Sequence, residues 1–166
     1  MAVLEAGRVA AGVTGHTTAK LSAQHTLIYA KLRKSAGKEA AHLYARSQQE
    51  AVEHLARTAA ELGIDCDLER VPAFTYAESA DAAGEMRAEA EAAAEAGLPA
   101  SFTTESTLPF PIAGAVRVED QAQFHPRKYL LGLAGAVISA ARPSSRTPGS
   151  WRSTRARRAA CGPPPG

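Results

Sequence analysis

The segment from Val3 to Lys20 combines residue types that bind anions. It reads VLEAGRVAAGVTGHTTAK, so an apolar run is followed by three glycines, three threonines and one lysine. Glycine lets the main chain approach a phosphate without an intervening Cβ, and a helix that starts after such a loop presents unpaired N–H donors. The spacing therefore predicts a phosphate-binding loop, and the same residues also suit a glycine-rich surface turn capped by threonines.

Glu5 adds a carboxylate at the end of the apolar run. In dinucleotide-binding folds an acidic residue after the second strand accepts hydrogen bonds from the adenosine ribose hydroxyls, about 20 residues after a G-x-G-x-x-G fingerprint. Only four residues precede Glu5, and the fingerprint occurs nowhere in the 166 residues. On this interpretation the first strand, the glycine turn and the first helix are missing from the N-terminus.

Three segments resemble FAD-dependent oxidoreductases of the D-amino-acid oxidase type, the superfamily that includes glycine, sarcosine and γ-glutamylputrescine oxidases. VLEAGRVAAGVTGHTTAK resembles their second strand and the loop that follows it. CDLERVPAFTYAES (66–79) resembles a substrate-domain strand, and DQAQFHPRKYLLGLA (120–134) resembles the helix that returns to the FAD domain. The likeness spans roughly residues 3 to 138 and is closest to members with a C-terminal Rieske iron–sulfur domain.

The resemblance implies FAD as cofactor and oxidation of the C–N bond of a small amine or amino acid, with a hydride equivalent passing to the flavin. It implies that Glu5 holds the ribose, that Arg8 lies beside the adenine and ribose end, and that the following loop runs along the diphosphate toward the isoalloxazine ring. No catalytic side chain is assigned, because the cofactor itself carries the electrons. The loop residues expected to contact FAD are Gly12, Thr14, Gly15, Thr17, Thr18, Ala19 and Lys20.

Composition and resemblance together predict an α/β class, or an α+β fragment: an incomplete FAD-binding Rossmann-like domain with part of the substrate-domain sheet and helices. Hydrophobic residues make up 45% of the chain, enough for one core. Cys66 and Cys161 are too few and too far apart for a disulfide framework or a C-x-x-C metal site. No apolar run approaches the roughly 20 residues of a membrane span, and no signal-peptide pattern is present, so a cytoplasmic protein without membrane contact is expected.

The last part of the chain has a different composition. From Arg142 onward there are six arginines and no acidic residue, with many Pro, Gly and Ser residues and no apolar periodicity. This predicts a partial oxidoreductase domain over residues 1–141 and a disordered tail over residues 142–166. The tail resembles nothing in the family and is typical of out-of-frame translation of GC-rich DNA, so we expect a frameshift. Its composition favours disorder over nucleic-acid binding.

The stretch 38–62 has the clearest helical pattern in the sequence, and Gly63 is its expected stop. His42 and His54 are twelve residues apart on it, more than three turns, so they cannot share a metal ion. We expect solvated or capping roles for both. The apolar face is expected to comprise Ala41, Tyr44, Ala51, Leu55, Ala59 and Leu62.

Three further stretches have helical patterns. The stretch 80–96 follows Ser79, a candidate N-cap, and has almost no large apolar side chains. It is therefore expected to be a peripheral helix with a solvated acidic face. The others are 22–35, which follows the loop directly, and 123–141, whose expected buried face comprises Tyr129, Leu130, Leu133, Val137 and Ile138.

Short strands are expected at 65–76, 101–105 and 113–119. Pro72 interrupts the first strand and, lacking an N–H, belongs at an edge or a bulge. The resemblance places the region 101–119, with LPFPI at 108–112, in the sheet that roofs the flavin and helps to form the substrate pocket, and an ordinary hydrophobic turn is the alternative for any single residue. His125, just before a proline at a helix start, is expected to cap or pack rather than to catalyse.

Two other classes of protein remain open from the sequence. One is a helical interaction protein built from 38–62 and 80–96, whose basic tail contacts an acidic partner. The other is a P-loop-like phosphotransferase, which is disfavoured because G-x-x-x-x-G-K-[ST] is absent. Without the glycine fingerprint and the rest of the sheet, the flavoenzyme interpretation predicts a polypeptide that is inactive alone.

Overall fold

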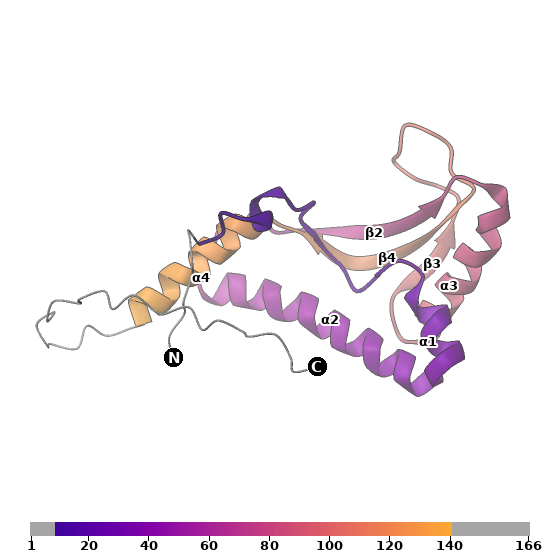
Figure 1. Ribbon diagram of the computed structural model, residues 1–166, viewed down its shortest axis with the longest axis horizontal. Coiled ribbons are helices and arrows are strands. Elements are labelled where there is room, and N and C mark those ends of the chain that lie inside the picture. The colour runs from indigo at the N-terminus through magenta and orange to yellow at the C-terminus, as the bar shows by residue number, and fades with distance from the viewer. Residues whose placement is uncertain (1–8, 141–166) are drawn as a thin grey trace, which may run out of the picture.

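The computed structural model describes residues 9–140 as helices packed against one face of a curved antiparallel sheet (Figure 1). This combination of helices and strands matches the predicted α/β, or α+β, fragment. Glu5, Arg8 and the tail 142–166 lie outside the described residues. The elements are the 3-10 helix η1 Val13–His16, β1 Lys20–Leu21, α1 Ile28–Ala36, α2 Lys38–Glu61, β2 Glu69–Ala77, the 3-10 helix η2 Ala80–Ala82, α3 Ala83–Glu95, β3 Ala100–Thr103, β4 Gly114–Gln123 and α4 Pro126–Ala140.

Strand β4 is the centre of the sheet. It pairs with β2 along one edge and with β1 and β3 along the other, and every one of these pairs is antiparallel. The register shifts at Pro72, where one residue of β2 faces Glu119 and Asp120 of β4, and Asp120 has a φ of +57°. Because proline cannot donate to the ladder, the interruption predicted there takes the form of a bulge.

Helix α3 lies in the core, which corrects the expectation of a peripheral helix. It packs against β3, β4 and α1, and its buried residues include Met86, Ala90 and Ala93. Small alanine side chains let the helix approach the sheet closely, so a helix with few large apolar residues still fills the interior. Ser79 accepts a hydrogen bond from the N–H of Asp81 and caps η2, which leads directly into α3.

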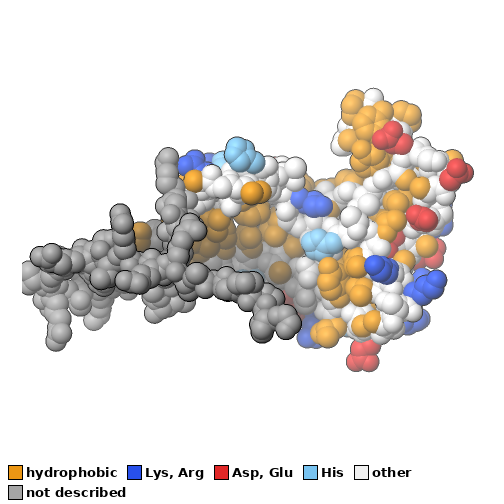
Figure 2. All heavy atoms as spheres, viewed as in Figure 1, with side chains coloured by type: hydrophobic (Ala, Val, Ile, Leu, Met, Phe, Trp, Pro, Cys, Tyr) orange, Lys and Arg blue, Asp and Glu red, His pale blue; other side chains and the backbone are white. Residues whose placement is uncertain are grey.

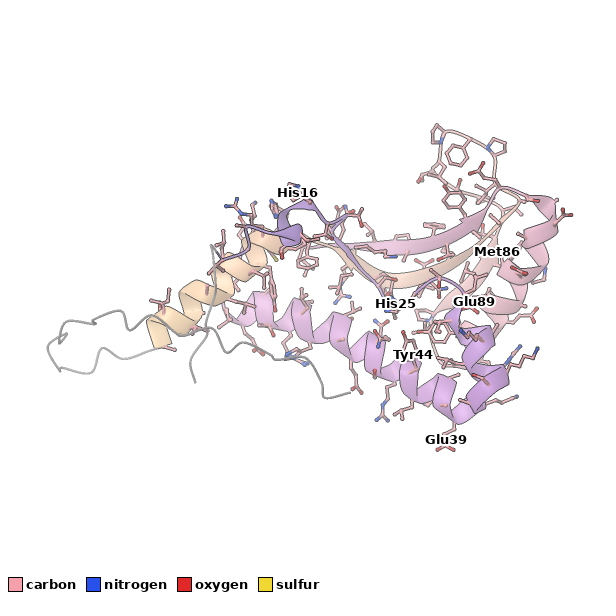
Figure 3. The ribbon with its side chains drawn as sticks, viewed as in Figure 1. His16, His25, Glu39, Tyr44, Met86 and Glu89 are labelled. Carbon is pink, nitrogen blue, oxygen red and sulfur yellow. The ribbon has the colours of Figure 1, made fainter. Side chains whose placement is uncertain are left out.

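Glu89 on α3 is fully buried beside the first turn of α1 (Figure 3). Its Oε1 accepts from the N–H of Tyr29 and its Oε2 from the N–H of Ala30, each at 2.7 Å. Helix α1 has Leu27 at its N-cap and no side-chain cap of its own. The carboxylate therefore supplies, from a distant part of the chain, the acceptor that a helix N-terminus needs.

Helix α1 starts at Ile28, later than the expected start at residue 22. The intervening loop is held by Ala23, whose N–H donates to Oε1 of Gln121 at 2.6 Å and whose carbonyl accepts from the hydroxyl of Tyr29 at 2.7 Å. These contacts satisfy the backbone without helical hydrogen bonds. Tertiary contacts therefore override the helical pattern in this segment.

Helix α2 confirms the prediction for 38–62, and Gly63 ends it with a φ of +62°. His54 is exposed, and Nδ1 of His42 lies 3.0 Å from the carbonyl of Ala96 at the end of α3, a capping contact. The buried face differs in part from the expected one, because Ala51 and Leu62 are exposed. The residues that α2 buries are Ala41, Ala45, Val52 and Ala59.

Helix α4 starts at Pro126, and the N–H of Lys128 donates to Nδ1 of His125 at 3.5 Å, which confirms the capping role. The prediction of a buried face on α4 is wrong. Within the structure of residues 9–140 none of the α4 residues is buried, and Ile138 is 73% exposed. Among the described residues, Ile64 packs against Gly132 and Phe124 packs against Tyr129, so the apolar side of α4 is covered only in part. No helix among these residues is both long and apolar enough to cross a bilayer.

Gly114 at the start of β4 is expected not to tolerate a side chain. A Cβ there would lie 2.6 Å from Cε2 of Phe102, which itself packs against the core. Gly114→Ala should therefore lower the free energy of unfolding by about 1–3 kcal/mol, measured by urea denaturation. The matched control is Gly84→Ala in α3, where a Cβ meets nothing within 4 Å, and which should be neutral or stabilising. Equal effects of the two substitutions would refute this packing argument.

Candidate cofactor-binding site

The loop Gly12–Lys20 crosses the end of the sheet where β2 begins and β4 ends. Its first half is η1, which the N–H of Gly15 closes by donating to the carbonyl of Gly12 at 3.3 Å. In the second half, Oγ1 of Thr17 accepts from the N–H of Ala19 at 3.2 Å, and Ala19 has a left-handed φ of +63°. The loop then enters β1, so the expectation that a helix follows it directly is wrong.

The loop divides its residues between two cavities. Thr14, Gly15, Thr17 and Ala19 line a cavity of about 410 Å³, which lies between the loop, the start of β2 and the junction of β4 with α4. Thr18 and Lys20 instead line a smaller cavity of about 190 Å³ on the sheet, together with residues of β2 that include Pro72 and Phe74. Six of the nine predicted contact residues therefore line a cavity.

Strand pairing holds this loop against the sheet. Lys20 is opposite Gln123, and the N–H of Phe124 donates to the carbonyl of Ala19 at 3.2 Å. The N–H of His125 donates to the carbonyl of Cys66 at 2.7 Å, which fixes the opposite wall of the larger cavity. The loop is consequently anchored at its C-terminal end by backbone contacts alone.

The larger cavity has acidic residues on the wall that faces the loop. Asp67 accepts from Nζ of Lys128 at 2.7 Å, and Glu69 accepts from Nε2 of Gln123 at 2.8 Å. The hydrogen bond with Asp67 raises the pKa of Lys128, so this lysine stays charged. The partner of Glu69 is an amide, which does not compensate the negative charge of the carboxylate. This wall therefore favours hydroxyl or cationic groups over an anionic diphosphate.

The residue types of the loop fit a ligand that is rich in acceptor oxygens. A Cβ on Gly12 would meet nothing within 4 Å, and on Gly15 it would meet only Cδ of Arg127 at 4.0 Å, so packing within residues 9–140 requires neither glycine. Gly12 has a φ of −85° and a ψ of −140°, which lie outside the helical and extended regions. Over the same residues, the side chains of Thr14, Thr18 and Lys20 make no hydrogen bond. The loop therefore offers open main chain, two hydroxyls and one ammonium.

Several residues around the loop have other roles or were missed. His16 is exposed on the outer side of η1 (Figure 3). Burial raises the pKa of the Cys66 thiol, which keeps it protonated and unreactive. Among the described residues no three His, Cys, Asp or Glu side chains form a metal site. Sequence reasoning missed the cavity residues Asp67, Glu69, Gln123 and Phe124, although all four belong to the segments that carried the resemblance.

Comparison with known proteins identifies the family. The family model described as FAD dependent oxidoreductase matches residues 1–142. The chain belongs to this family. FAD is therefore the cofactor of the family to which the chain belongs. The resemblance seen in the sequence is confirmed.

The chain is also similar to the putative Rieske 2Fe-2S iron-sulfur protein YhfW of Bacillus subtilis (strain 168). The two are 32% identical over 136 residues, which cover 82% of this chain and 27% of that protein. The relative's name agrees with the expected likeness to family members that carry a Rieske domain. The chain thus spans little more than a quarter of the length of the relative that it matches. No solved structure gave a significant match.

Proposed function

We propose that this chain supplies part of the flavin site and the substrate-facing sheet of an enzyme that oxidises the C–N bond of a small amine or amino acid. The observation that carries the proposal is the family match over residues 1–142, together with a loop that leaves main chain, hydroxyls and an ammonium open to a ligand. When bound, FAD accepts a hydride equivalent from the carbon that bears the nitrogen. The protein's part is to bind and orient both molecules.

The two cavities suggest how the loop divides this task. Lys20 and Thr18, on the sheet side, suit the anionic diphosphate, because an ammonium and a hydroxyl both donate to phosphate oxygens. Thr14, Gly15, Thr17 and Ala19 face the wall of Asp67 and Glu69, which suits the hydroxyl-bearing part of the cofactor. Gly12 lets the main chain approach the ligand. In this proposal Glu5 accepts from the ribose hydroxyls and Arg8 lies beside the adenine.

We further propose that a polypeptide of these 166 residues is catalytically silent by itself. It contains no G-x-G-x-x-G turn, which supplies much of the diphosphate binding in dinucleotide folds. The strands of residues 9–140 form only antiparallel pairs, and no α4 residue is buried by these residues. In the same proposal, residues 142–166 are a tail outside the oxidoreductase domain.

The expected result of expression is a purified protein without a stoichiometric visible flavin band. In thermal-shift measurements, added FAD should raise the midpoint by a few degrees, corresponding to about 1 kcal/mol, and AMP and ATP should raise it less. Lys20→Ala should abolish the FAD effect, whereas Lys34→Ala, which changes a lysine at the end of α1, should preserve it.

Three outcomes would contradict parts of this proposal. A stoichiometric yellow protein that turns over an amine would refute catalytic silence. An FAD effect that survives Lys20→Ala would refute the role of the loop. Salt-sensitive oligonucleotide binding without any effect of FAD would favour the helical interaction protein with a basic tail instead.

A further inference from the structure

A third cavity lies on the open face of the sheet, at the end formed by the β3–β4 connection. The chain between β3 and β4 rises above the sheet and bends back over it (Figure 1). Hydrophobic side chains gather at this end of the molecule (Figure 2). Together with β2 the rising segment encloses a recess of about 200 Å³, whose lining residues are Phe74, Tyr76, Ser106, Thr107, Leu108 and Ile112.

The lining of this recess is aromatic and solvent-accessible. The rings of Tyr76 and Phe110 lie 5.9 Å apart at an angle of 53°, and these residues are 42% and 38% exposed. Phe74 and Leu108 are exposed to a similar extent. Clustered exposed apolar surface costs solvation free energy and marks a binding region more often than isolated exposed residues do.

The recess is large enough for one ring. An apolar cavity of about 150 Å³ is enough to bind one benzene molecule. A recess of about 200 Å³ therefore has room for one ring with a short substituent. The lining also contains three residues with hydroxyl groups, Tyr76, Ser106 and Thr107, but no charged side chain.

The nearby charges favour an amine over an amino acid. Arg117 is the residue opposite Phe74 on β4, and its guanidinium carbon lies 5.8 Å from the centre of that ring. Its Nε is 2.7 Å from Oε1 of Glu119, an ion pair in which the N–H is not aligned for a hydrogen bond. Because Glu119 already pairs with this partly exposed arginine, the residues described around the recess offer no unpaired cation to a substrate carboxylate.

The recess and the candidate cofactor loop share one face of the sheet. Phe74 lines both the recess and the cavity that contains Lys20. Phe74 pairs with Arg117, and Lys20 pairs with Gln123. Six residues of β4, or roughly 20 Å, therefore separate the positions of Phe74 and Lys20 along the sheet. A small molecule held in the recess therefore lies on the face along which the cofactor would extend.

We propose that this recess binds the ring of a primary amine that carries a single aromatic or cyclic apolar group and no carboxylate. The inference rests on the proposed function and deepens it, since it narrows the substrate from any small amine or amino acid to this class. Phe74, Tyr76 and Leu108 contact the ring, and the amine end points out of the recess along the sheet toward the cofactor loop.

The test is ligand-observed fluorine NMR on the full 166-residue chain without FAD. The signal of 4-fluorobenzylamine should broaden on addition of protein, whereas that of 2,2,2-trifluoroethylamine, which has no ring, should not. 4-Fluorophenylglycine, which adds a carboxylate, should bind about tenfold more weakly than 4-fluorobenzylamine.

Two variants locate the binding. Thr107→Trp fills the recess from an exposed loop position and should weaken the binding of 4-fluorobenzylamine about tenfold, and Tyr76→Ala should do the same by removing one wall. Leu43→Ala removes an exposed apolar side chain from α2 and should leave binding unchanged. Thermal midpoints measured in parallel show whether each variant is folded.

Absence of broadening in the wild-type chain, or equal binding by folded Thr107→Trp, would overturn the recess as the site. Equal binding of the phenylglycine would overturn the preference for an amine. Because no FAD is present, these failures are separate from those of the proposed function. If FAD did not raise the thermal midpoint of the wild-type chain while 4-fluorobenzylamine still bound in the recess, the proposed oxidoreductase role would be overturned and an amine-binding pocket would remain.

Discussion

Glu89→Ala is expected to lower the free energy of unfolding by about 3–5 kcal/mol, which is a large part of the stability of a domain of this size. The substitution removes the acceptor of the buried N–H of Tyr29 and of the part-buried N–H of Ala30, and leaves both without a partner. It also removes the cap of α1 and leaves a cavity in the core. Urea denaturation followed by far-UV circular dichroism measures the loss.

Two further substitutions on α3 isolate the cause. Glu91→Ala changes an exposed glutamate on the same helix and should alter stability by no more than about 0.5 kcal/mol. Glu89→Gln keeps one oxygen for one N–H and should lose roughly half as much stability as the alanine variant. If Glu89→Ala lowered the free energy of unfolding no more than Glu91→Ala does, the inference that the Glu89 carboxylate caps α1 would be wrong.

Gln121→Leu is expected to have the second largest effect, a loss of about 2–4 kcal/mol. Gln121 is 1% exposed and accepts from the N–H of Ala23 at 2.6 Å. Its Nε2 donates to Oε1 of Gln49 at 3.1 Å and to the carbonyl of Glu119 at 2.8 Å. Leucine keeps the volume but leaves these polar groups unpaired, so β4, α2 and the segment after the candidate loop lose their common link.

Hydrogen exchange distinguishes this mechanism from general destabilisation. In Gln121→Leu, the exchange rate of the Ala23 amide should rise above its wild-type value by a larger factor than that of the Val116 amide. Val116 lies on β4, the strand of Gln121, but away from the substitution. The control is Gln48→Leu, which removes only a contact at 3.1 Å with the exposed His25 and should cost about 0.5 kcal/mol or less. Uniform acceleration across the sheet would show that Gln121 does not specifically anchor the segment that follows the candidate loop.

Local features of the sequence predicted much of the fold. The extent of α2, its glycine stop, the cap at Ser79, the interruption at Pro72 and the helix start at Pro126 all follow from caps, breakers and periodicity, which act over a few residues. The segments that carried the family resemblance also contain the loop and the cavity residues opposite it. Their mutual approach could not be predicted, because the pairing of Lys20 with Gln123 joins distant parts of the chain.

By itself, then, the sequence determined the family, the cofactor class of that family and the main helices, since these depend on residue type and short-range spacing. Only the tertiary structure decided that α3 is central, that Glu89 caps α1, and that aromatic residues of β2 and the β3–β4 connection enclose a recess. The physical reason is common to all three. Burial and hydrogen-bond partners depend on which distant elements come into contact, and an alanine-rich helix or a lone glutamate has no local pattern that reveals its neighbours.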